Sequence, residues 1–233
     1  GLKRCCTCRQ ITYNRCMNTT SHMTAIARLA ESEGVFTTAQ ASRLGIPRDA
    51  LHDAAESGRV ERVCRGAYRL VGSGSSETDE LAAVWKLTAP ARFTHERTRT
   101  SDWDGIVVGG TTAAAMLDIG DFYLSPYRVY APRRINSRNP VVRFGVRDIA
   151  RADVTFEHGI PVTRPERTIS DLVTDGEDPS TVADALRDAV RGDSGFDFGR
   201  LRGLLCDRYG VEKAGRVYDG LLADAGLVGG EGR

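Results

Sequence analysis

Between residues 24 and 58 the apolar positions recur three or four residues apart, as they do along helices, in three short blocks. Each block ends at a glycine, at Gly34, Gly45 and Gly58. Thr37 and Gln40 form a T-x-x-Q capping box at the start of the second block, and Pro47 suits the start of the third. The pattern predicts three helices, with a tight turn in RLGIPRD between the second and the third.

Two short strand-like segments follow in GRVERVCRGAYRLVG, and Gly66 can take a positive φ at the turn between them. A helix, a second helix, a tight turn, a third helix and a two-stranded hairpin occur in this order in a winged helix-turn-helix. We therefore expect residues 23–72 to form a winged helix-turn-helix DNA-binding domain.

Residues 73–80 are small and polar, which is typical of a linker, and we expect a second domain over residues 81–233. Its strand candidates are DGIVVGG, PYRVYAP, VVRFGV and VTFEHGIPVT, with EHG as a turn. Its helix candidates include ELAAVWKLTA, TTAAAMLDIG, RPERTISDLV, DPSTVADALRDAV, FGRLRGLLCDRYG and AGRVYDGLLADAG. The expected fold class is α/β (α+β): a winged helix-turn-helix, then a mixed α/β domain that ends in helices.

Residues 1–22 form a basic leader with four crowded cysteines, which we expect to be disordered. They lack the spacing of a disulfide framework or a zinc finger, so no metal site is predicted. No apolar run approaches the roughly 18 residues that cross a bilayer, and no signal peptide is evident. A cytoplasmic protein that does not associate with membranes is the expectation.

The net charge is only +1, so an electrostatic argument for nucleic-acid binding depends on local patches. The hairpin holds four arginines against Glu61 alone, and in a winged helix-turn-helix the helix after the turn enters the major groove. The candidate DNA contacts are Thr38, Gln40, Arg48, His52, Arg59, Arg62, Arg65 and Arg69. Segment 24–72 has seven arginines and six acids, so a protein-interaction module remains an alternative.

A second basic stretch, residues 128–151, has seven arginines and one acid, Asp148. Its candidate contacts are Arg128, Arg133, Arg134, Arg138 and Arg143. The stretch could extend a DNA footprint or bind RNA or a phosphate ligand, with Tyr127 and Tyr130 available to stack. The alternative is a solvated strand face and loop.

Signals for catalysis are weak. Asp102 and Asp104 follow a GSGSSE segment and superficially resemble the metal-binding pair of nucleotidyltransferases, but the pair lies far from the Gly-Ser turn. The chain has no GxGxxG motif or P-loop, so we predict no catalytic residues and no cofactor. A metal-dependent nuclease or nucleotidyltransferase directed to nucleic acid is the alternative function.

Two segments of the sequence are similar to the AbiEi-type antitoxins of abortive-infection systems. GVFTTAQASRLGIPRDALHDAAESGRVERVCRGAYRL resembles their N-terminal domain, and GIPVTRPERTISDLV, residues 159–173, resembles their second signature. The resemblance implies a bacterial transcriptional repressor of its own operon, bound to double-stranded operator DNA, and the antitoxin of a type IV toxin–antitoxin pair in phage defence.

The resemblance also implies how the antitoxin acts. Its partner is expected to be a nucleotidyltransferase-like toxin, countered without a stable complex by the C-terminal domain. For Arg167 and Thr168 we favour a structural role, such as capping the helix of PERTISDL, over a role toward the toxin. The sequence leaves a homodimer open.

Overall fold

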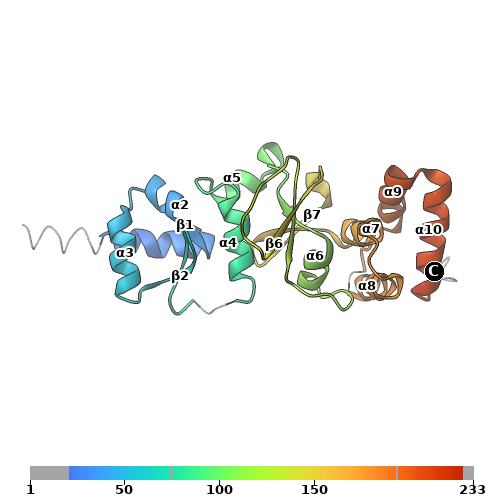
Figure 1. Ribbon diagram of the computed structural model, residues 1–233, viewed down its shortest axis with the longest axis horizontal. Coiled ribbons are helices and arrows are strands. Elements are labelled where there is room, and N and C mark those ends of the chain that lie inside the picture. The colour runs from blue at the N-terminus through green and yellow to red at the C-terminus, as the bar shows by residue number, and fades with distance from the viewer. Residues whose placement is uncertain (1–20, 74–75, 193, 228–233) are drawn as a thin grey trace, which may run out of the picture. The chain divides into compact units, whose positions relative to one another are not determined.

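The computed structural model describes residues 21–73, 76–192 and 194–227, which fall into two compact units divided after Asp102 (Figure 1). Of the leader predicted over residues 1–22, only Ser21 and His22 are described, and both belong to a helix over residues 21–33. The rest of that prediction lies outside the described residues.

The first unit contains the three helices and the two hairpin strands predicted for residues 24–72. The helix over 21–33 is followed by β1 (Phe36–Thr37), α2 (Thr38–Arg43), α3 (Arg48–Glu56), β2 (Val60–Cys64) and β3 (Ala67–Leu70). The strands form an antiparallel sheet in the order β1-β3-β2, of which β1 was not predicted. Thr37 and Gln40 form the predicted capping box of α2.

The helix over 21–33, α2, α3 and the three-stranded sheet are called the first module below. Its core is formed by the inward faces of these helices and strands. Ile26, Leu29, Phe36, Leu51 and Val60 are each at most 2% exposed and form one apolar cluster. These residues lie at the helical and strand spacings seen in the sequence, because each element has one face to bury.

The first unit continues past residues 73–80, where a linker was predicted, through α4 (Asp79–Leu87), α5 (Thr94–Thr98) and the 3-10 turn η1 (Thr100–Asp102). The physical reason is that α4 has an apolar face, with Leu81 and Trp85 buried, that packs on the sheet. Ala83 of α4 joins Val35 and Ala67 in a second apolar cluster.

The second unit begins with a mixed five-stranded sheet in the order β6-β5-β4-β8-β7. Its elements are β4 (Val107–Val108), α6 (Gly110–Met116), β5 (Tyr127–Ala131), β6 (Val142–Val146), the 3-10 turn η2 (Arg151–Asp153), β7 (Val154–Glu157) and β8 (Ile160–Thr163). As predicted, β7 and β8 are joined by a turn, in which His158 and Gly159 have φ values of 51° and 76°.

Four helices complete the unit: α7 (Pro165–Asp175), α8 (Pro179–Gly192), α9 (Phe198–Tyr209) and α10 (Val211–Asp224). Helix α6 packs on β5, β8 and α7, while α7 packs on α8 and α9, and α10 packs on α8 and α9. The fold is therefore mixed α/β and ends in helices, as predicted. Within the part of the chain that is described, no helix has the length and apolarity to cross a membrane.

Candidate nucleic-acid interface

The register of the β2–β3 hairpin decides which of its arginines reach solvent. Arg65 and Gly66 form a two-residue turn, and Gly66 has a φ of 91°, a conformation that favours glycine. Cys64 pairs with Ala67, but a bulge follows, so that Arg62 faces Tyr68 and Glu61 faces Arg69. Without the extra residue, the same turn would set Arg62 opposite Arg69, a repulsive cross-strand pair.

The pairing across the hairpin takes Arg69 out of the basic surface. Its guanidinium donates to Glu61 Oε2 at 2.5 Å, its Nε lies 3.5 Å from Asp79, and its side chain is only 13% exposed. The structure therefore places Arg69, one of the predicted DNA contacts, in an intramolecular ion-pair network.

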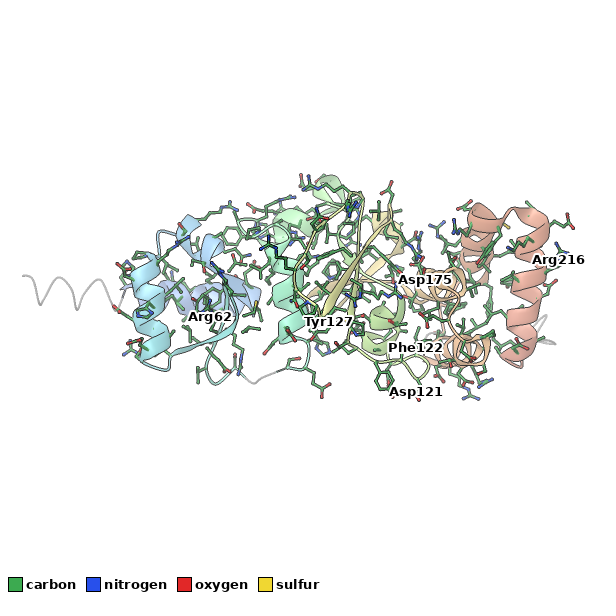
Figure 2. All side chains as sticks on the ribbon, in the orientation of Figure 1. Arg62, Asp121, Phe122, Tyr127, Asp175 and Arg216 are labelled. Atoms are coloured by element: carbon green, nitrogen blue, oxygen red, sulfur yellow. The ribbon has the colours of Figure 1, made fainter. Side chains whose placement is uncertain are left out.

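The other three hairpin arginines are exposed. Arg59, Arg62 and Arg65 lie at the solvent surface of unit 1, and Arg62 is marked in Figure 2. Arg62 Nε donates to the carbonyl of Cys64 at 3.3 Å. Within residues 21–73, 76–192 and 194–227, no carboxylate forms an ion pair with any of the three. The hairpin thus presents three positive charges within seven residues that no described carboxylate compensates.

The outward face of α3 has the opposite character. Asp49, Asp53 and Glu56 are exposed, and His52 Nε2 lies 3.5 Å from Glu56 Oε1. Arg48, at the first position of the helix, is exposed and forms no ion pair with the described carboxylates. Its neighbours on the solvent face of α3 are therefore mainly acidic.

The two residues of α2 that were predicted to contact DNA form hydrogen bonds within the fold. Gln40 is fully buried: its Oε1 accepts the N–H of Thr37 at 2.9 Å, and its Nε2 donates to Arg92 O at 2.9 Å and to Glu33 at 3.1 Å. Thr38 is half-buried, and its N–H donates to Gly66 O at 3.0 Å. The structure gives both residues positioning contacts and does not bring Gln40 to the surface.

Two ion pairs that the sequence analysis missed join α4 and α5 to the helices that precede the hairpin. Arg43 forms a bidentate pair with Glu96, at 2.7 and 2.9 Å, and its guanidinium lies 4.6 Å from the ring centre of Phe93. In the interior, Lys86 donates to Glu33, whose carboxylate also accepts from Thr94. Both pairs join residues 53 positions apart, so no local sequence pattern could have revealed them.

The pKa values of the residues in these ion pairs differ from their ordinary values. Hydrogen bonds from Arg43, assisted by the N–H of Phe93, lower the pKa of Glu96 to about 2. Burial alone would raise the pKa of Glu33, but the charge and hydrogen bonds of Lys86, together with Thr94, outweigh burial and lower it. Burial lowers the pKa of Lys86 despite its acidic partner. Helices α4 and α5 are thus bound to the module by charge as well as by apolar contact.

In the second basic stretch the arginines divide into exposed and internal groups. Arg133, Arg134, Arg138 and Arg143 are exposed, whereas Arg128 lies 3.9 Å from Glu177. Arg147 pairs with Asp171 at 2.7 Å and with Asp175, and its guanidinium lies 4.5 Å from the ring centre of Tyr130.

The aromatic residues of this stretch are not available for stacking. Tyr127, labelled in Figure 2, is 5% exposed and Tyr130 is 2% exposed, because both residues lie in the buried part of β5. The suggestion that they stack on bases is therefore wrong. The exposed arginines of the stretch remain a candidate surface for phosphate contact.

Asp102 and Asp104 make local contacts. Asp102 accepts a hydrogen bond from the hydroxyl of Ser101 at 2.9 Å, and Asp104 accepts the N–H of Ile106 at 3.0 Å. Among the residues that the structure describes, no group of three or more His, Cys, Asp or Glu side chains is arranged to hold a metal ion.

The PERTISDL segment forms α7, but neither of its singled-out residues caps the helix. The N-cap is Arg164, without a side-chain hydrogen bond. Thr168 is fully buried and contacts the hydroxyl of Thr163 at 2.7 Å and its carbonyl at 3.0 Å, while Arg167 pairs with Asp171 at 3.0 Å. Thr168 therefore ties α7 to the end of β8, whereas Arg167 forms an ion pair within α7.

Comparison with known families finds a family that the first module resembles. Residues 25–71, which contain most of the first helix, α2, α3 and the hairpin, match a family of transcriptional regulators. That family is described as "Transcriptional regulator, AbiEi antitoxin". The resemblance to AbiEi-type antitoxins is thereby confirmed over these residues, at the level of the family.

The fold of most of the chain has a counterpart among solved structures. The crystal structure of the RV2827C protein from Mycobacterium tuberculosis matches with a TM-score of 0.50 over 89% of this chain and 81% of that chain. The sequence identity is 16%, so the similarity shows the fold alone. No curated protein matches the sequence.

Proposed function

We propose that this protein is a DNA-binding transcriptional autorepressor and the antitoxin of a type IV toxin–antitoxin pair in abortive infection. The helix over 21–33, α2, α3 and the β2–β3 hairpin form its winged helix-turn-helix, with the hairpin as the wing. The observation that carries the proposal is the set of three exposed, uncompensated arginines on that hairpin, Arg59, Arg62 and Arg65. They lie inside the segment that matches the AbiEi regulators.

Uncompensated guanidinium groups favour binding to DNA because each one that neutralises a phosphate releases a condensed counterion. An arginine that is already paired with a carboxylate contributes less to the free energy of DNA binding, since that ion pair must break first. The near-zero net charge of the chain does not oppose this function, because a duplex responds to the charge within a Debye length of about 10 Å at 0.1 M salt.

The test of DNA binding is a mobility-shift titration of the full chain on the DNA upstream of its own coding region. Replacing Arg62 and Arg65 by alanine should weaken binding to all sequences and reduce the salt slope by about 2. Arg216→Ala is the matched control, because Arg216 is an exposed arginine of α10, 74% exposed, outside the matched segment (Figure 2). Unchanged affinity in the double variant, or equal loss in the control, would contradict the assignment.

The proposed toxin is a nucleotidyltransferase-like protein encoded next to this one, countered by the second unit without a stable complex. Expression of that neighbour should arrest growth, and co-expression of the full chain should restore it. The Arg62→Ala, Arg65→Ala variant should still restore growth, because these residues are proposed to contact promoter DNA and not the toxin. Failure of the unmodified chain to restore growth would reject the antitoxin role while leaving the repressor role to the titration above.

A further inference from the structure

We infer that the protein engages duplex DNA through the β2–β3 hairpin, and that α3, the helix after the tight turn, does not enter the groove. The inference rests on the proposed DNA-binding function and specifies how the surface is used. It reverses the usual assignment, in which the helix after the turn reads the major groove.

The first argument is the charge on α3. Successive residues of a helix are 100° apart, so His52, Glu56, Asp49 and Asp53 span the arc opposite buried Leu51 and Ala54. Glu56 and Asp49 lie at the middle of that arc, and Nε2 of His52 lies 3.5 Å from Glu56 Oε1. A groove is lined by phosphates, so inserting this face would bring three carboxylates into a strongly negative field.

Arg48 does not compensate for these acids. It is the first residue of α3 and lies at the border of the exposed arc, about 100° from Asp49 and about 80° from Glu56 by helical geometry. From this position an arginine can contact a phosphate beside the groove. It is therefore expected to contribute less than the hairpin arginines do.

The second argument is the charge and shape of the hairpin. Its single acid, Glu61, is held by Arg69 at 2.5 Å, so Arg59, Arg62 and Arg65 determine its field. β2 is an outer strand of its sheet, and Arg65 lies at the turn, so the tip and one edge of the ribbon are open to a partner. A two-stranded ribbon fits the major groove, and arginine is the commonest reader of guanine there.

The third argument is how the hairpin is supported. Gly66 O accepts the N–H of Thr38, the first residue of α2, at 3.0 Å, and β3 pairs with β1. α4 packs on both β2 and β3. The hairpin is therefore supported by three other elements of its unit, α2, β1 and α4, and such support is what a rigid DNA-reading element requires.

The experiment compares two variants of the full chain on the operator and on a panel of single-base operator mutants. The α3 variant carries Asp49→Asn, Asp53→Asn and Glu56→Gln, and the hairpin variant carries Arg62→Gln and Arg65→Gln. All five side chains are exposed, so both variants should fold, which circular dichroism and thermal unfolding verify. The α3 substitutions are isosteric and remove only charge, and the hairpin substitutions remove charge while keeping a polar side chain.

We expect the α3 variant to bind as tightly as the unmodified protein or more tightly, with the same ranking of operator mutants. The hairpin variant should bind about tenfold more weakly or worse, and its ranking should flatten. Arg48→Ala should lose less affinity than Arg65→Ala.

Three results overturn the inference, and they distinguish failure of the proposed function from failure of the hairpin-led mode. If the unmodified protein shows no salt-dependent DNA binding, the proposed function fails and the inference fails with it. If the unmodified protein binds but the α3 variant loses affinity or reorders the operator mutants, the proposed function stands and the hairpin-led mode is wrong. A hairpin variant that keeps both its affinity and its ranking leads to the same conclusion.

Discussion

Arg69 lies opposite Glu61 across the β2–β3 pair and donates to its carboxylate at 2.5 Å. Arg62, one residue beyond Glu61, is exposed and has no such partner among the described carboxylates. The bulge between Arg62 and Cys64 produces this difference, because it shifts the register so that an acid, and not a second arginine, faces Arg69. Two arginines of the same hairpin therefore have separate roles: Arg69 pairs within the fold, and Arg62 belongs to the proposed DNA-binding surface.

The first prediction separates those roles. Arg69→Met should lower the free energy of unfolding by about 1 kcal/mol, because Glu61 and Asp79 lose their shared partner. Arg62→Met should change it by less than about 0.5 kcal/mol, as expected for an exposed side chain without an ion pair. Urea denaturation of both variants measures this. An Arg62 variant as destabilised as the Arg69 variant would show that the hairpin arginines share one structural role.

The second prediction concerns pH. The pKa of Glu96 is about 2 in the folded protein, against 4.5 as its ordinary value, owing to hydrogen bonds from Arg43 and Phe93. A depressed acid pKa stabilises the fold above the ordinary value, and this contribution is lost as pH falls from 4.5 toward 2. Urea midpoints at pH 6, 4 and 3 should therefore fall less steeply in Glu96→Gln than in the unmodified protein. Parallel profiles would show that the pair does not form in solution.

The sequence predicted the elements that have one apolar face. α3 and α8 show their buried residues at helical spacing, and the hairpin is bracketed by Gly58 and Gly72 with Gly66 at its turn. The same local periodicity could not show that α4 completes the first unit. That placement depends on contacts between residues far apart in the sequence: the apolar face of α4 packs on the sheet, and Lys86 meets Glu33, which is 53 positions away.

The candidate site was predicted less well than the fold, because the charge of a residue does not reveal its partner. Arg59, Arg62 and Arg65 are exposed, as a DNA contact requires, but the bulge that pairs Arg69 with Glu61 has no signature in the sequence. Gln40 was assigned both to a capping box and to DNA contact, and it is buried in the former. The amide of a side chain that is buried and hydrogen-bonded in a helix cap is not available to bind a ligand.

The third prediction tests the packing of the second unit's sheet. A Cβ on Gly109 would lie 2.0 Å from Cε2 of Tyr130, whose ring is buried and covered by Arg147. Gly109→Ala should therefore destabilise the protein by about 1–3 kcal/mol through overpacking. Gly203→Ala, within α9 and with open space around its Cβ, should instead stabilise it by up to about 1 kcal/mol. Thermal unfolding measures both, and similar shifts in the two variants would contradict the packing described for Tyr130.

The last prediction decides whether residues 159–173, the segment that resembles the second signature of the AbiEi antitoxins, have a structural role. Thr168 is fully buried, and its hydroxyl contacts both the hydroxyl and the carbonyl of Thr163. Thr168→Val keeps the shape but leaves Thr163 without its buried partner, which should cost about 1–3 kcal/mol. Thr168→Ser keeps the hydroxyl and loses one methyl group, at a cost of about 0.8 kcal/mol.

If the role of Thr168 is structural, neutralisation of the proposed toxin should follow the stability of these variants. Thr168→Ser should restore growth beside the toxin nearly as well as the unmodified chain, and Thr168→Val should fail only in proportion to the folded protein that remains. Soluble protein and urea midpoints, measured in parallel with growth, provide the comparison. If Thr168→Val kept its folded level yet lost neutralisation, the threonine would have a role toward the toxin, and the hydroxyl pair with Thr163 would not be its main function.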